Sequence, residues 1–349
     1  HNALKEIAKE LNIIHLSAYN IKQKCYYEKI DNIHYIRKGN NLFNVIIEGA
    51  KFYYKYKNNI LAVIDHSNTH QFFTFFWARK KRIFFIHQLT LEIWGYFFGR
   101  PIGSILQYFE EILIRISKGP AITVSKSTAK DLTIRGFKDL FICPEGNFIK
   151  NLEFPESKKN SYLVYAGRLV PYKRVEDAIM LANALNKKLY IIGNGPENYK
   201  NKLKKLIEKT NSDAHLLGYT EKSVKDDLIK NAYLLVMPSI REGWGLVITE
   251  SANLGTPSIV YPVNGTIEAT NYGHAGFLAE KIGWTYLLER VNKISDEEYL
   301  EIRKKAFEYS LKFTWKNTSI EFKNLMKEII EKMGVNYEEA SNWYITDNI

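Results

Sequence analysis

The chain has 349 residues, of which 46% are hydrophobic and 25% are charged, and its formal net charge is +11. This length is sufficient for about two domains, each with its own core. No run of residues approaches the ~18 uncharged apolar positions that a membrane-spanning helix needs. The two cysteines, Cys25 and Cys143, indicate no disulfide framework. The composition therefore argues against a membrane-spanning protein and against a small disulfide-stapled domain.

The positive charge is concentrated in the first half of the chain. Residues 1–155 contain 22 Lys and Arg against 13 Asp and Glu, whereas residues 156–349 contain 27 against 25. Such an excess predicts an anionic partner for the first half. At this point nucleic acid, acidic lipid headgroups and phosphorylated substrates all remain open.

Strand-like and helix-like segments alternate through the first half. The chain begins in a helical pattern, residues 1–11, without an initiator Met. Short β-branched or apolar runs follow at residues 12–19, 60–65, 82–87, 121–125 and 140–146. Helical periodicity fills residues 42–57 and 104–116. This alternation predicts a sheet of mainly parallel strands with helices packed against it.

The same pattern restarts after a polar, turn-rich stretch from Gly146 to Ser161. Strand-like runs occur at residues 161–167, 188–195, 214–218, 232–239, 256–262 and 276–280, and residues 295–333 are helical. We therefore predict an α/β protein with two doubly wound domains at residues 1–152 and 153–314, and a final helical segment at residues 315–349.

Unusual polar residues follow three strands of the second domain. Arg168 and Lys173 come after the first of these strands, and Gly193 and Gly195 form a tight turn after the second. The fourth strand leads into the sequence REGWGLVITES, which contains Glu242. Ligands of doubly wound sheets bind beyond the carboxyl ends of the strands. We therefore expect these residues to share one site.

The loop around Gly243 and Gly245 has the features of an anion site. Glycines let a backbone approach a ligand closely, and the following helix carries partial positive charge at its N-terminus. Glu250 lies about one and a half turns into that helix, where its carboxylate can accept ribose hydroxyls. A ligand that combines ribose, diphosphate and sugar would use Arg168, Lys173, Glu242 and Glu250 together.

These motifs give the chain a family resemblance. It resembles the retaining, nucleotide-sugar-dependent glycosyltransferases of family four (group 1), which have the GT-B fold. The match is carried by YAGRLVPYKRVEDAI, LYIIGNGP, LLGYTEKSVKDDL, MPSIREGWGLVITESANLGTP and GTIEATNYGHAGFL, and more loosely by FFIHQLTLEIW and AITVSKSTAKDLTIRGF. It implies two Rossmann-like domains that face a cleft. It also implies that the last helix, which should start near Trp315, crosses back to the first domain.

The resemblance also implies roles for individual residues. Arg168 and Lys173 would hold the donor diphosphate, Glu250 the ribose, and Glu242 the region of the transferred sugar. His87 would contact the donor sugar from the first domain. The backbone of residues Gly243, Trp244, Gly245 and Leu246, together with Gly193 and Gly195, would complete the donor site. Family members begin with a strand and a glycine-rich loop, which we expect to be missing from this sequence.

The expected reaction needs no cofactor other than the donor substrate, a UDP or GDP sugar. No Asp-x-Asp motif is present, so a metal-clamped diphosphate is not indicated. His66 and His70 have the i, i+4 spacing of a helical metal site, but further ligands are not evident. Two alternatives to transfer onto a glycan or lipid-linked acceptor stay open. One is a soluble disaccharide or polysaccharide synthase, and the other is a non-catalytic nucleotide-sugar-binding protein.

The first half interleaves basic and aromatic residues, as in QFFTFFWARKKRIFF and EIWGYFFGRPIGSILQYF. One interpretation is a peripheral surface that meets anionic membrane and a lipid-linked acceptor, in a protein at the inner face of the membrane in the cytoplasm. The other is a buried helix that ends in a solvated run from Arg79 to Arg82. No recognisable RNA-binding motif is present, so we do not expect a nucleic-acid partner.

Overall fold

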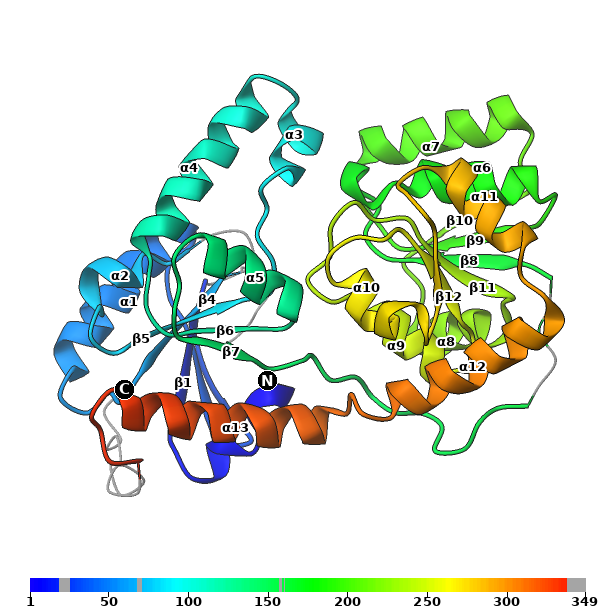
Figure 1. The fold of residues 1–349 in the computed structure, drawn as a ribbon. Helices are drawn as coiled ribbons and strands as arrows, with labels where there is room; N and C mark the ends of the chain where they lie inside the picture. The colour runs from blue at the N-terminus through cyan, green and yellow to red at the C-terminus, as the bar shows by residue number, and fades with distance from the viewer. Residues whose placement is uncertain (19–25, 68–70, 157–158, 160, 338–349) are drawn as a thin grey trace.

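The computed structural model describes residues 1–18, 26–67, 71–156, 159 and 161–337. Cys25, His70 and the last twelve residues of the predicted final segment lie outside this set. The chain folds into two α/β lobes that lie side by side (Figure 1). Among the described residues, no helix is long and apolar enough to cross a membrane.

The first lobe contains a three-stranded and a four-stranded sheet. The first has the order β1 (Ile13–Ser17), β3 (Ile33–Arg37), β2 (Tyr27–Ile30), and the second has the order β4 (Val63–Ser67), β5 (Arg82–Ile86), β6 (Ala121–Thr123), β7 (Leu140–Ile142). All neighbouring strands are parallel except β2 and β3. The helical elements of this lobe are η1 (Asn2–Leu4), η2 (Ile7–Lys9), α1 (Leu42–Tyr56), α2 (Thr74–Trp77), α3 (Ile93–Phe98), α4 (Ile102–Ile116) and α5 (Lys126–Ile134).

The second lobe is built on one six-stranded, fully parallel sheet. Its order is β10 (Ala214–Gly218), β9 (Leu189–Ile192), β8 (Leu163–Ala166), β11 (Leu234–Met237), β12 (Ser258–Val260), β13 (Phe277–Leu278). The helical elements are η3 (Pro171–Lys173), α6 (Val175–Ala184), α7 (Glu197–Thr210), α8 (Lys222–Asn231), α9 (Leu246–Asn253), α10 (Thr266–Ala269), η4 (Asn271–Gly273), α11 (Trp284–Asn292) and α12 (Asp296–Ser310).

Helices cover both faces of this sheet, with α6, α7 and α11 on one side and α8, α9 and α12 on the other (Figure 1). All residues of β8 and β11 are buried, which explains why these strands appear in the sequence as continuous apolar runs. The α/β prediction and the two-lobe arrangement are confirmed.

The last described helix, α13 (Trp315–Lys332), leaves the second lobe and lies along the first (Figure 1). Its buried face, which includes Phe322, Met326 and Ile329, packs against Ile7 and Ile83 of the first lobe. Thr314 caps the helix by accepting a hydrogen bond from Asn317 N at 3.0 Å. The predicted return of the final helix to the first domain is therefore confirmed.

Two elements depart from the sequence expectation. The helical pattern of residues 1–11 appears as two one-turn 3-10 helices. The β2–β3 hairpin was not predicted at all. Its turn residues, Asp31 and Asn32, both have positive φ angles, 48° and 61°. Two consecutive positive φ angles match the twist that antiparallel strands need in a two-residue turn.

The two chain crossings between the lobes touch each other. Asn147 N donates to the Phe313 carbonyl oxygen at 2.9 Å, and Trp315 N donates to the Asn147 carbonyl oxygen at 3.3 Å. Gly146 makes this contact possible, because a Cβ there would lie 2.7 Å from backbone atoms of Thr314 and Trp315. The crossings form a single paired connection between the lobes.

We predict that Gly146→Ala destabilises the protein, because the added methyl group must displace backbone atoms. The expected loss in unfolding free energy is about 1–3 kcal/mol, measured by denaturant unfolding. Gly95→Ala is the matched control, since a Cβ at Gly95 meets no described atom within 4 Å. Equal stability of the two variants would contradict a tight crossing.

Candidate functional site

Loops after β8, β9 and β11 come together at one edge of the second sheet, because these strands are neighbours and parallel. The loop after β8 contains Arg168 and η3. The loop after β11 contains Arg241 and Glu242. A backbone hydrogen bond from Ile240 N to the Tyr172 carbonyl oxygen, at 2.9 Å, joins the two loops. The structure thus brings together two of the segments that the sequence placed in one site.

A buried ion pair lies between these loops. Lys173 Nζ donates a hydrogen bond to Glu242 Oε1, and both side chains are buried. Neither charge would be tolerated at this depth alone, since an unpaired buried charge is expensive. The Lys173 ammonium also lies 5.3 Å from the ring centroid of Tyr172. Each charge therefore holds the other in place beside the sheet edge.

Arg168 is exposed and lies on the same aromatic ring. Its Nη2 donates to the Tyr172 hydroxyl oxygen at 2.6 Å, and its guanidinium carbon is 5.9 Å from the ring centroid. The Arg168 carbonyl oxygen accepts a hydrogen bond from the Tyr165 hydroxyl at 2.9 Å. Burial, reinforced by the Glu242 carboxylate, raises the pKa of Tyr165 well above its ordinary value, so Tyr165 remains a neutral donor. This contact fixes the backbone that carries Arg168.

Gly193 and Gly195 pack against the Arg168 loop. A Cβ at Gly193 would lie 1.8 Å from the Gly167 carbonyl oxygen, and one at Gly195 would lie 1.9 Å from the Leu169 carbonyl oxygen. Leu169 N donates to the Asn194 carbonyl oxygen at 2.9 Å. The observed task of these two glycines is thus to let the loops after β8 and β9 touch. Their predicted contact with a ligand remains a prediction.

The turn after Glu242 reaches across to the first lobe. A Cβ at Gly243 would lie 2.3 Å from the His87 carbonyl oxygen, so only glycine fits there. Gly245 has φ 95°, and the following helix α9 begins at Leu246, which is half-buried. The Trp244 ring is buried, with its centroid 4.8 Å from that of Phe313. Only the Trp244 backbone is therefore free to face a ligand, and the contact of that backbone with a donor, which the resemblance implies, remains a prediction.

Glu250 lies half-buried on α9, where Glu250 Oε2 accepts a hydrogen bond from Lys225 Nζ of α8 at 2.7 Å. Sequence reasoning missed Lys225. It is one of three lysines on α8, and the sequence does not show which of them reaches Glu250. The pair places a positive charge directly beside the carboxylate that was predicted to bind ribose.

His87 occupies the end of β5 in the first lobe, and both of its ring nitrogens have protein partners. Nδ1 lies 2.5 Å from Glu145 Oε1, and Nε2 lies 2.7 Å from His66 Nε2. Burial, followed by the nearby charge of His87, lowers the pKa of His66 to about 4. Because His66 is neutral, a single proton between the two facing Nε2 atoms can form a hydrogen bond from one ring to the other. Glu145, His87 and His66 are therefore linked in a continuous chain of polar contacts.

The i, i+4 spacing of His66 and His70 does not lie on a helix, so it does not form a helical metal site. His66 lies in strand β4 rather than on a helix, and His70 is outside the described residues. No group of three or more candidate metal ligands occurs in the described part of the chain. His66 serves instead as a hydrogen-bond partner of His87.

Ion pairs and hydrogen bonds join the two lobes next to this site. Arg241 is buried; its Nε lies 2.8 Å from Glu92 Oε1, and its Nη1 lies 2.8 Å from Asp131 Oδ2. Glu268 of the second lobe accepts hydrogen bonds from the backbone nitrogens of Lys126 and Ser127, at 2.8 and 2.7 Å. These contacts hold the Glu242 turn against the end of β5.

The basic run of the first lobe does not form one surface. Arg82 is buried and its Nη1 donates to the Ser117 carbonyl oxygen at 2.6 Å. Lys81 donates to the Lys57 and Ile60 carbonyl oxygens, at 2.7 and 2.5 Å. Only Arg79 and Lys80 of the run are exposed. Of the run from Arg79 to Arg82, which one interpretation expected to be solvated, the second half instead holds backbone carbonyls of the lobe.

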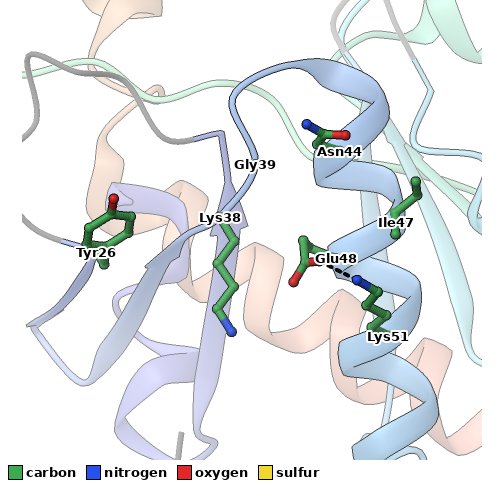
Figure 2. A pocket seen from close by; sticks show the side chains of 7 residues that line it. All are labelled: Tyr26, Lys38, Gly39, Asn44, Ile47, Glu48 and Lys51. Atoms are coloured by element: carbon green, nitrogen blue, oxygen red, sulfur yellow. Dashed lines mark hydrogen bonds and ion pairs between the residues drawn. The ribbon is translucent and has the colours of Figure 1, made fainter.

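A pocket lies in the first lobe, where β3 leads into α1. Figure 2 shows its lining: Tyr26, Lys38, Gly39, Asn44, Ile47, Glu48 and Lys51. Lys51 Nζ pairs with Glu48 Oε1 at 2.9 Å. This pocket contains none of the predicted donor residues, so it is separate from the Lys173–Glu242 site.

We predict that His66→Gln makes the protein less sensitive to acid. The folded state binds the His66 proton only near pH 4, whereas an unfolded histidine binds it near pH 6.5. Stability contributed by neutral His66 is therefore present above about pH 6.5 and is lost as the pH falls towards 4. The variant should reduce the slope of unfolding free energy against pH between pH 6 and 5, by less than the roughly 1.4 kcal/mol per pH unit of a fully desolvated group, because the His66 side chain also contacts solvent.

His274→Gln, which removes an exposed histidine, is the control for this measurement. It should leave the slope as it is in the parent protein. An unchanged slope in His66→Gln would contradict the neutral state of His66 in the folded protein.

The chain is similar to known glycosyltransferases in sequence and in fold. Residues 148–313, just under half of the chain, match the family model of glycosyl transferases group 1. A curated relative is the capsular polysaccharide biosynthesis glycosyltransferase CapM of Staphylococcus aureus. It is 25% identical over 248 residues, which cover 65% of this chain and 64% of that protein. The alignments span between 39% and 64% of the length of four curated relatives.

The fold is shared with solved structures of low sequence identity. Sucrose-phosphate synthase from Thermosynechococcus elongatus has a TM-score of 0.77 at 16% identity, covering 95% of this chain and 92% of that one. Anabaena HepE in complex with UDP-glucose has a TM-score of 0.66 at 15% identity, with 85% and 87% covered. The chain therefore has the GT-B fold of these glycosyltransferases.

Proposed function

We propose that this chain, whose residues 148–313 form a group 1 glycosyl transferase domain, is a retaining glycosyltransferase. It would move a hexose from a nucleoside diphosphate sugar to a glycan or lipid-linked acceptor without a metal ion. The main observation that supports this proposal is that the Arg168–Lys173 loop and the Glu242 turn meet at one edge of the sheet, where Lys173 and Glu242 are in contact.

The diphosphate would lie between Arg168, Lys173 and the first turn of α9. The exposed guanidinium of Arg168 is anchored on Tyr172 and suits two phosphate oxygens. The start of α9 carries the partial positive charge of a helix N-terminus and so favours negative charge. Three sources of positive potential would therefore surround one pyrophosphate group.

The sugar end of the donor would face Glu242 and the first lobe. Glu242 is held by Lys173, and the adjoining Gly243 touches the His87 carbonyl group. We propose that the His87 imidazole forms a hydrogen bond with a sugar hydroxyl. To do so, it must give up its contact with either Glu145 or His66. On the other side, Glu250 and Lys225 would receive the ribose hydroxyls.

In the reaction the bond between the anomeric carbon and the diphosphate oxygen breaks, and a bond to the acceptor hydroxyl oxygen forms. The acceptor hydroxyl gives up its proton to the departing diphosphate oxygen, and the nucleoside diphosphate leaves with the electron pair of the broken bond. Negative charge grows on the leaving phosphate, where Arg168, Lys173 and α9 would stabilise it. This arrangement supports metal-independent transfer.

The excess positive charge of residues 1–155 supports contact with an anionic acceptor surface at the inner face of the membrane. UDP-glucose is the ligand in the HepE structure, so UDP-hexoses are the first donors to screen, followed by GDP-hexoses. A bound donor should raise the unfolding free energy by about 2.7 kcal/mol at a hundredfold excess over Kd.

We predict that Arg168→Ala and Lys173→Ala each lower turnover by about 10²–10³-fold, comparable to the loss of one preorganised donor. Release of nucleoside diphosphate, with and without acceptor glycans, is the measurement. Lys281→Ala, which changes an exposed lysine, is the control.

Arg168→Ala is the sharper variant, because Arg168 is exposed and its loss leaves no buried charge behind. Parent-like rates in Arg168→Ala would refute the assignment. Donor binding without any nucleotide release in the parent protein would favour the alternative of a non-catalytic binding protein.

A further inference from the structure

The helical hairpin at residues 93–116 presents apolar side chains to solvent. We call these residues the apolar hairpin; it comprises α3, α4 and their connection, and it projects from the first lobe (Figure 1). Its exposed large apolar residues are Tyr96, Phe97, Phe98, Ile102, Ile105, Tyr108, Phe109, Ile112 and Ile116. Contiguous apolar surface of this kind marks an interaction site on a folded protein.

An ordinary surface helix buries its apolar face and exposes its charged side chains, whereas α4 exposes apolar side chains and turns its carboxylates towards the protein. Glu110 turns inwards, where Oε1 accepts from Thr90 N at 2.7 Å and Oε2 accepts from Leu91 N and Trp94 Nε1 at 2.7 and 2.8 Å. Glu111 pairs with Arg135 at 2.7 Å. The carboxylates of the helix therefore serve its attachment to the lobe, and its apolar side chains remain outside.

The charge that does lie on the outer part of the apolar hairpin is positive. From Ile93 to Phe109 the only charged residue is Arg100, which is exposed in the connection between the two helices. Arg115 and Lys118 are exposed near the base. Apolar and aromatic side chains around a cationic tip match the interface of an anionic bilayer, where lipid tails cover the former and phosphates neutralise the latter. A second copy packed on the same face would instead bring arginines towards arginines.

The apolar hairpin is held in one shape. Its helices cross in backbone contact, since a Cβ at Gly103 would lie 2.6 Å from the Gly95 Cα atom. The ring centroids of Trp94 and Phe98 lie 6.0 Å apart in a stacked pair. The exposed side chains are therefore displayed by a folded element rather than by a loose loop.

The apolar hairpin also reaches the candidate donor site. Ile93 packs with Val170 and Tyr172, and the Phe97 ring lies edge-on to Tyr172 with 6.0 Å between centroids. Tyr172 is the residue whose hydroxyl accepts a hydrogen bond from Arg168. One continuous set of contacts therefore runs from the exposed apolar surface to the predicted diphosphate position.

We propose that the apolar hairpin inserts into the interfacial layer of an anionic lipid bilayer and so presents the donor site to a membrane-anchored acceptor. The identification of the acceptor as lipid-linked rests on the proposed function. Membrane binding itself does not, because the side chains that contact lipid lie outside the donor site. Of the two basic and aromatic stretches considered from the sequence, the proposal rests on EIWGYFFGRPIGSILQYF, most of which lies in the apolar hairpin.

Vesicle co-sedimentation of the full chain, without donor, tests the proposal. We expect binding to phosphatidylcholine vesicles that contain phosphatidylglycerol. The double variant Tyr108→Ser/Phe109→Ser, at side chains that are 66% and 58% exposed, should weaken this binding at least about tenfold. Arg100→Ala should weaken it about fivefold on anionic vesicles and leave binding to pure phosphatidylcholine unchanged.

The matched control is Leu152→Ser/Tyr219→Ser, which removes side chains that are 82% and 85% exposed away from the apolar hairpin. It should bind vesicles as the parent does. Equal binding by the Tyr108/Phe109 variant, or no binding by the parent, would overturn the proposal. So would concentration-dependent dimerisation of the parent that this variant abolishes, because a second copy would then occupy the surface.

Donor binding measured by thermal shift without vesicles separates this proposal from the proposed function. The Tyr108→Ser/Phe109→Ser variant should keep the parent's donor-induced shift. Loss of vesicle binding with an intact donor shift supports the membrane surface on its own. A parent that binds vesicles but no nucleotide sugar would leave the membrane surface standing and refute the donor site.

Discussion

The contact between Lys173 and Glu242 is the interaction on which the proposed site depends. Lys173 and Glu242 lie on the loops that follow two different strands, and both side chains are buried. If either loop moved away, the charge on the remaining loop would be left buried without a partner. The pairing fixes η3 against the turn that precedes α9. A pyrophosphate that approached this edge would meet a lysine already in place and a guanidinium already resting on Tyr172.

The same pairing links the site to the relation between the lobes. Glu242 is followed by Gly243, which touches His87, and preceded by Arg241, which bridges to Glu92 and Asp131. Opening the lobes would break these charged contacts, and closing them would return the Glu242 turn to the end of β5. The paired crossings at Gly146 and Thr314 adjoin the same turn, since the Trp244 ring packs on Phe313 and Glu145 pairs with His87. The lobes are therefore joined at the site and at the chain crossings beside it.

Sequence patterns predicted much of the second lobe because a buried parallel strand is apolar on both faces. The loop glycines at 193, 195, 243 and 245 were singled out for contact with a ligand, whereas three of them are seen to face another segment of the protein backbone within 2.5 Å of an added Cβ. Sequence patterns cannot identify partners that meet only after folding. Glu145 reaches His87 from 58 residues away, and Lys225 reaches Glu250 from another helix. The sequence also did not show that apolar side chains of α4 are exposed. Helical periodicity reveals an apolar and a polar face, but it does not show which of the two faces solvent. The domain boundaries and the ligand roles of the site residues stay predictions.

The central claim is that the second lobe binds a pyrophosphate through the Arg168–Lys173 loop and the start of α9. Calorimetric titration of the parent and of Arg168→Ala with a nucleoside diphosphate and with the corresponding nucleoside tests it most directly. We expect the variant to bind the diphosphate at least about tenfold more weakly, since a charge-assisted hydrogen bond contributes about 1.5–3 kcal/mol, and to bind the nucleoside as the parent does. Equal affinity of the two proteins for the diphosphate would contradict the account.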